Sequence, residues 1–342
     1  MEKVRMDPEP LVSICIPTYN RAGMIHKAIE SALAQTYENI EVIVVDNAST
    51  DNTASVAASY ADKRLKYVKN DRNLGLFGNF NRCVEEASGA YVHILHSDDY
   101  IDPDFTASCM AFFRTHPSVV LTTTGARIVG PGGESDISYS KTDFLLAAPE
   151  GFRRLLAERS FIVCPSVMIR SDMYREAGLY NLEYPYSSDY YLYLKIARAH
   201  DIGFVAAACL YYRQGEHSES YRFLFSSPQG YLDMLRIFMQ LRTDLGPDMD
   251  EYAREFQAAQ RRFIHDCIFA GFTRTDTMQG FSPWVFSGLA ITCWTLEKPV
   301  SLSLWLAKVR DVLVILPAGL LMGWSPTRRV VRSLFFSRRD SY

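Results

Sequence analysis

The first half of the chain alternates short apolar runs with stretches in which apolar residues recur at helical spacing. Each apolar run has the length of a buried strand. The predicted strands are residues 11–17, 40–45, 65–68, 91–95 and 119–124. The first predicted helix covers residues 24–33, and the second runs from "NASTDNT" to about Ala61. A third helix ends near Ser88, and a fourth begins near Pro103. This alternation predicts an α/β layer with a mostly parallel central sheet flanked by helices.

The second half has a different pattern. Residues 163–169 and 202–213 read as strands, residues 188–200 as a helix, and the pattern beyond Pro228 as long helices. We therefore predict two parts, an α/β domain over residues 1–220 and a helical region over residues 221–342. The uncharged stretch Val312 to Trp324 is short for a membrane span, and arginines follow it. It fits either a helix on an anionic membrane surface or a core hairpin with a solvated basic end.

Composition narrows the class of protein. The chain has 342 residues, 48% of them hydrophobic, and a formal net charge of −3. It can build a full core, and its weakly acidic balance argues against a nucleic-acid partner. The seven cysteines form no CxxC pair, which is typical of a reducing compartment, and residues 1–10 do not resemble a secretion signal. We expect a cytoplasmic protein, peripheral at the inner membrane face if its last helices bind lipid.

Polar clusters follow three of the predicted strands. They are Pro17 to Asn20, Asp46 with Asn47, and Ser97 to Asp99. In sheets of this kind ligands bind beyond the carboxyl ends of the strands. The adjacent carboxylates Asp98 and Asp99 repel each other, so a divalent metal, a basic side chain or water should lie beside them. Oxygen ligands suit Mg²⁺ or Mn²⁺.

Two long stretches carry a family resemblance. They read "SICIPTYNRAGMIHKAIESALAQTYENIEVIVVDNASTDNT" and "NDRNLGLFGNFNRCVEEASGAYVHILHSDDYIDPDF". In order and spacing they resemble the family 2 glycosyltransferases, which are inverting enzymes of GT-A fold, and the resemblance extends over about residues 11–218. It departs from the usual family pattern at Asn47 and Ala48, which replace a common "DG", and at Phe80, where many members have arginine.

The resemblance implies a donor site for a nucleotide sugar. In the family pattern the base and ribose pocket corresponds here to Pro17, Thr18, Tyr19 and Asn20. Asp46 would accept hydrogen bonds from the base or ribose. Asn73 and Gly75 would shape the loop near the nucleotide. Asp98 would assist at the nucleotide sugar, and Asp99 would bind the Mn²⁺ or Mg²⁺ ion that neutralises the diphosphate.

Two further residues follow from the same resemblance. Asp189, in "YPYSSDYYLYLKIA", matches the family's base, which takes the proton of the acceptor hydroxyl. The alternative is that Asp189 only caps the helix, and a helix N-terminus would keep its carboxylate ionised. His217, in "YYRQGEHSES", matches a further metal ligand of some members, the alternative being a structural or exposed histidine.

The resemblance implies an inverting, metal-dependent hexosyltransferase. The donor would be a nucleotide-diphosphate sugar, most commonly of UDP, and the acceptor a glycan or lipid-linked saccharide in cell-surface polysaccharide or glycoconjugate synthesis. The alternative is a catalytically inactive carbohydrate-binding or scaffold protein with the same fold. A nucleotidyltransferase fits less well, because "PTYNRAG" lacks the Gly-rich basic loop. A metal-dependent phosphohydrolase fits less well because only one acidic pair is placed at the sheet ends.

Overall fold

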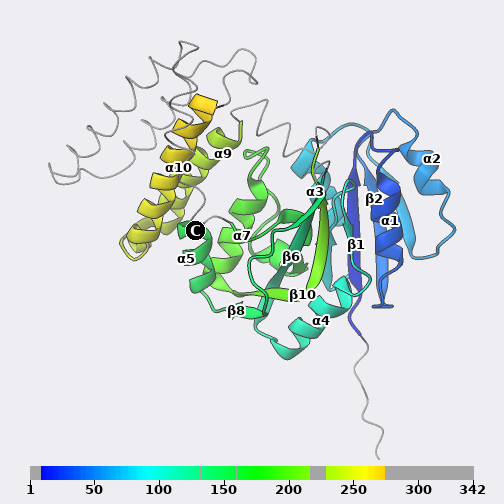
Figure 1. Ribbon diagram of the computed structural model, residues 1–342, viewed down its shortest axis with the longest axis horizontal. Helices are drawn as coiled ribbons and strands as arrows, with labels where there is room; N and C mark the ends of the chain where they lie inside the picture. The colour runs from blue at the N-terminus through cyan, green and yellow to red at the C-terminus, as the bar shows by residue number, and fades with distance from the viewer. Residues whose placement is uncertain (1–8, 131–132, 159, 216–228, 274–342) are drawn as a thin grey trace, which may run out of the picture.

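The computed structural model describes residues 9–130, 133–158, 160–215 and 229–273 (Figure 1). The strands are β1 Val12–Thr18, β2 Ile40–Asp46, β3 Leu65–Lys69, β4 Tyr91–Ile94, β5 Tyr100–Ile101, β6 Val119–Gly130, β7 Gly133–Asp136, β8 Phe144–Leu146, β9 Met168–Arg170 and β10 Asp201–Arg213. The α-helices are α1 Ile25–Leu33, α2 Thr53–Ala58, α3 Leu76–Glu86, α4 Phe105–Thr115, α5 Glu150–Ala157, α6 Met173–Glu176, α7 Ser188–Ala199, α9 Gln229–Leu245 and α10 Ala253–Thr273. The 3₁₀ turns are η1 Cys164–Ser166 and η2 Gly246–Asp250.

All of these strands belong to one sheet. Its order is β3-β2-β1-β4-β9-β6-β10-β5, with β7 paired to β6 and β8 to β10. The pairs β1–β2, β2–β3, β1–β4 and β6–β10 are parallel, and β9 runs antiparallel between β4 and β6. Six strands therefore run in one direction, namely β1, β2, β3, β4, β6 and β10, and their carboxyl ends meet at one edge. The predicted α/β layer with a mostly parallel sheet is confirmed.

Side-chain alternation along β1 explains how the sheet is covered. Val12, Ile14 and Ile16 face one core together with α1, α2 and α4, whereas Cys15 faces a second core with α3, α5 and α7. Because every residue of β1 is buried, its apolar run continues almost without a break. Helices α9 and α10, yellow in Figure 1, belong to the second core and pack outside α5 and α7.

The structure corrects several predicted boundaries. The expected strand over residues 163–169 is a strand only at Met168–Arg170, because the preceding segment with Pro165 forms η1. Strand β6 continues to Gly130, and α2 ends at Ala58. The long helices expected after Pro228 are present as α9 and α10.

Part of the helical region expected over residues 221–342 lies outside the described residues. This applies to the stretch Val312 to Trp324, to the arginines after it and to the division at residue 220. Within the described part of the chain, no helix combines the length and the apolar character that crossing a membrane requires.

Candidate active site

Two loops at the carboxyl ends of β1 and β2 are tied together by Asn20. The Asn20 backbone N–H donates to Ser49 Oγ at 2.9 Å, and its side-chain oxygen accepts the Thr50 backbone N–H at 2.8 Å. Asn20 has a φ of 52°, a conformation that asparagine adopts more readily than most residues. The neighbouring Tyr19 is 45% exposed. These contacts fix the loop and leave an aromatic ring open to solvent.

Asp46 is fully buried below these loops. One carboxylate oxygen accepts the Ser49 backbone N–H at 2.7 Å, and the other accepts the Tyr67 hydroxyl at 2.5 Å. Burial raises the pKa of Tyr67, and the contact with Asp46 raises it further. The side chain therefore braces the loop in this conformation, whereas the family resemblance implies that it contacts base or ribose.

Four asparagine side chains, which we call the asparagine network, connect β2, β3 and the start of α3. Asn47 donates to Asn73 Oδ1 at 2.8 Å and to the Gly75 carbonyl at 3.1 Å. Asn70 donates to Asn47 Oδ1 at 3.1 Å and to Asn79 Oδ1 at 2.8 Å. Gly75 begins α3 with φ 77° and ψ 178°, a conformation that only glycine adopts without strain. The network places Asn73 and Gly75 beside the β2 loop.

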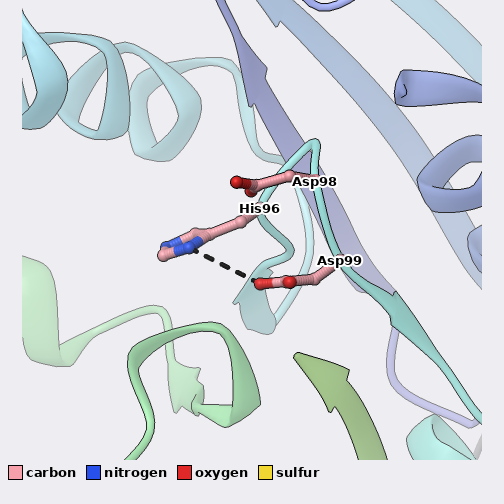
Figure 2. Close-up of side chains that lie close together, drawn as sticks. All are labelled: His96, Asp98 and Asp99. Carbon is pink, nitrogen blue, oxygen red and sulfur yellow. Dashed lines mark ion pairs between the residues drawn. The ribbon is translucent and has the colours of Figure 1, made fainter. Parts of the chain in front are cut away.

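The turn after β4 brings together His96, Asp98 and Asp99, which point to one side of it (Figure 2). One ligand atom of each lies within 4.8 Å of the others. Asp99 is 1% exposed, and its Oδ1 accepts the Arg213 backbone N–H at 2.8 Å. Asp99 Oδ2 and His96 Nε2 are buried without a hydrogen-bond partner, and His96 Nδ1 lies 3.8 Å from that Oδ2.

The electrostatics of this turn favour a cation. Burial, followed by the charge of Asp98, raises the pKa of Asp99 well above its ordinary value. Burial also lowers the pKa of His96, so its imidazole stays neutral. Neutral imidazole and carboxylates are ligands of divalent ions such as Mn²⁺, and two of these ligand atoms have no partner in the described structure. The residues present therefore fit a divalent metal.

Arg213, at the end of β10, holds this turn from the opposite side. Its backbone N–H donates to Asp99 Oδ1, as described above. Its guanidinium donates to the Asp98 carbonyl and, at 2.9 Å, to the Met24 carbonyl. The turn is thereby joined to the segment that precedes α1. His217 follows four residues later and lies outside the described residues.

Asp189 is the second residue of α7. The N-cap position belongs to Ser187, whose side chain makes no capping hydrogen bond. Burial raises the pKa of Asp189, whereas contacts with the Tyr190 backbone N–H and the Cys164 side chain lower it. Burial thus outweighs the helix N-terminus, contrary to the expectation that the N-terminus would set the ionisation of this group.

Cys164, in η1, relates Asp189 to the turn that carries Asp98 and Asp99. Burial raises the pKa of its thiol, and the carboxylates of Asp189 and Asp99 raise it further. Its sulfur also accepts the Tyr193 hydroxyl at 3.4 Å. The charges of both carboxylates therefore reach the same thiol.

Sequence reasoning did not find three of these residues. His96 was signalled only by its place at the end of an apolar strand, three residues before Asp99. Tyr67 and Asn70 gave no signal, because Tyr67 binds Asp46 and Asn70 binds Asn47, each more than twenty positions away along the chain.

Sequence comparison agrees with this architecture. The profile described as glycosyl transferase family 2 matches residues 13–178. An uncharacterized glycosyltransferase of Rickettsia felis is 34% identical over 201 residues, which are 57% of this chain and 33% of that protein. One of Rickettsia typhi is 32% identical over 202 residues, or 57% of this chain and 61% of that protein. The chain thus matches between about a third and about three fifths of these relatives' length.

Solved structures share the fold. TarS of S. aureus (residues 1–349, with UDP-GlcNAc) matches with a TM-score of 0.61 and 20% identity, over 83% of this chain and 89% of that one. The mannosyltransferase PcManGT of Pyrobaculum calidifontis, with GDP-Man and Mn²⁺, matches with a TM-score of 0.55 and 15% identity, over 97% and 88%. Residues 13–178 are thus a glycosyl transferase family 2 domain, and the chain has the GT-A fold.

Proposed function

We propose that this protein is a metal-dependent, inverting glycosyltransferase that moves a sugar from a nucleotide-diphosphate sugar to an acceptor hydroxyl. One observation carries the proposal. His96, Asp98 and Asp99 gather ligand atoms within 4.8 Å of one another, and two polar atoms of this group, His96 Nε2 and Asp99 Oδ2, are buried without a hydrogen-bond partner. A buried polar atom without a partner is unfavourable, so a ligand is expected there.

The donor nucleotide would lie over the first two loops. Pro17, Thr18, Tyr19 and Asn20 would line the base and ribose pocket, with the exposed ring of Tyr19 available for stacking on the base. Asn73 and Gly75 would shape the side of the pocket formed by the asparagine network, and Asp46 would act by bracing the loop. We propose UDP as the nucleotide, in line with the UDP-GlcNAc complex of TarS.

The metal site would consist of Asp99, with Asp98 and His96 beside it, and His217 is proposed as a further ligand from sequence. A bound Mn²⁺ or Mg²⁺ ion supplies positive charge that stabilises the diphosphate as it leaves. Arg213 holds this turn in place, because its backbone N–H donates to Asp99 Oδ1 and its guanidinium donates to the Asp98 carbonyl.

Asp189 would be the general base. Its carboxylate takes the proton of the acceptor hydroxyl while that oxygen attacks the anomeric carbon from the face opposite the diphosphate. The bond to the diphosphate breaks as the new bond forms, so the stereochemistry inverts. Burial raises the pKa of Asp189, which brings its basicity closer to that of a working base. We propose a glycan or lipid-linked saccharide of the cell surface as the acceptor.

Calorimetric titration of UDP and GDP, with and without Mn²⁺, tests the donor site. Wild type should bind UDP only with metal, and Asp99→Ala should lose that binding. Asp104→Asn is the matched control, because Asp104 is an exposed carboxylate five positions further along the chain. Equal binding of both nucleotides by all three proteins, with or without metal, would refute the donor site.

Asp189→Asn then separates an enzyme from an inactive protein with the same fold. Nucleotide affinity should stay within about twofold, while release of UDP from UDP-sugars should fall about 10²- to 10⁴-fold. An unchanged rate of UDP release would show that Asp189 is not the base.

A further inference from the structure

Helix α9 lies outside the α/β layer, where it contacts α7 near its own C-terminus and contacts the segment before α7 near its start. Near the far end, Tyr191 donates to Asp244 at 2.6 Å, and Arg198 donates to the Asp244 carbonyl at 3.2 Å. Near the start of α9 the ring of Tyr186 packs closely on the helix backbone, because a Cβ atom on Gly230 would lie 2.8 Å from that ring. Helix α9 therefore holds α7, which carries Asp189, from outside the α/β layer.

Asp233 is the polar centre of this contact and is fully buried. Its Oδ2 accepts the backbone N–H of Tyr186 at 2.7 Å and that of Ser187 at 3.1 Å. Its Oδ1 accepts the Gln229 side chain at 2.7 Å, and the Arg236 guanidinium lies 4.0 Å away. A buried carboxylate is unfavourable unless it is hydrogen-bonded in this way, so its partners identify what it holds.

The two amides that Asp233 binds lie directly before α7. Ser187 is the N-cap of that helix, and its own side chain makes no capping hydrogen bond. The N-cap side chain therefore gives the entry to α7 no support, and Asp233 binds the two amides at this entry from α9. Asp189 follows two residues later. A displacement of the entry would move its carboxylate, and small displacements of a catalytic group slow reactions strongly.

We propose that Asp233 is a positioning residue for Asp189, acting from α9 through the backbone amides of Tyr186 and Ser187. The proposal rests on the proposed function, since it assigns to Asp189 the role of base. It also gives α9, which lies outside the α/β layer, a part in the reaction, because this helix fixes where the base points.

Three variants test the proposal. Asp233→Leu removes both acceptors at similar size, and Asp233→Asn keeps one oxygen for the two amides. Asp244→Ala is the control, because it removes another acidic contact between α9 and α7 that does not touch those amides. Hydrogen exchange of Tyr186 and Ser187, UDP affinity with Mn²⁺, and UDP release from UDP-sugars are measured for each. Asp233→Ala replaces the leucine variant if the latter does not fold.

Asp233→Leu should accelerate exchange of the two amides at least about tenfold and slow UDP release about 10- to 100-fold. UDP affinity should stay within about twofold, Asp233→Asn should restore exchange and turnover, and Asp244→Ala should match wild type. Unchanged exchange in Asp233→Leu, or faster exchange with full turnover, overturns the proposal. If wild type releases no UDP from any UDP-sugar, the proposed function fails, and the exchange comparison alone decides whether Asp233 anchors the segment.

Discussion

His93 gives a prediction whose magnitude follows from the structure. It lies on β4 and is fully buried, with Nε2 2.8 Å from the Pro165 carbonyl and the ring stacked on Phe105. Nδ1 has no hydrogen-bond partner in the described structure. Burial lowers the pKa of His93 from 6.5 to about 4, against the opposing effect of the Pro165 carbonyl. Between pH 6.5 and about 4 the His93 imidazole is therefore neutral in the native state, whereas the same imidazole is protonated in the unfolded chain.

The sign and the size of the effect follow from proton linkage. Between pH 6.5 and about 4 the unfolded state binds more protons at His93 than the native state does, so stability falls with falling pH. The full difference corresponds to about 3 kcal/mol, since one pKa unit is about 1.4 kcal/mol. This stability is present above pH 6.5 and is lost as the pH falls to about 4.

Urea unfolding of wild type and His93→Gln at several pH values isolates this contribution. Glutamine does not titrate, so wild type should lose about 3 kcal/mol relative to the variant between neutral pH and about pH 4. Asp99 and Asp189, whose pKa values are raised, have the opposite pH dependence, but both proteins contain them and their effect cancels in the difference. Parallel stability curves for the two proteins would refute the reasoning.

Three further predictions concern the site. Mn²⁺ should raise the melting temperature more at about pH 8 than at about pH 5, because burial raises the pKa of Asp99 and the metal competes with its proton, and Asp99→Asn should abolish the increase. Tyr67→Phe should lower the free energy of unfolding in urea by about 2 kcal/mol, because it removes the hydroxyl that donates to the buried carboxylate of Asp46. Tyr60→Phe removes a solvent-facing contact with Glu30 and should cost less than about 0.5 kcal/mol. Gly75→Ala should lower stability by about 1 kcal/mol or more because of its φ of 77°, and Gly23→Ala, with open space around it, should be close to neutral in the same measurement.

The centre of the sheet was predictable from sequence because β1 and β2 are buried on both faces and read as nearly continuous apolar runs. Strands β5, β7 and β8 were not predicted, because two to four residues give no periodic signal. The direction of β9 was not predictable either. It depends on η1, whose Pro165 and Ser166 are fixed by His93 and Thr123 more than forty residues away.

The site was predictable to the extent that it depends on strand ends. Asn20 and Asp99 follow β1 and β4, and Asp46 is the last residue of β2. The shared direction of these strands places the three residues at one edge. The roles of these residues stay predictions. Asp233 gave no signal, because a single carboxylate in an amphipathic helix reads as a solvated residue until its partners are known.

The asparagine network has a consequence for the dependence of the protein on salt. Its four side chains are amides, so the corner between β2, β3 and α3 is held by groups without charge. Dissolved ions screen charges and leave neutral hydrogen bonds nearly unaffected. The corner should therefore keep its shape as ionic strength rises, so any salt dependence of donor binding would come from the phosphates and the metal rather than from this network.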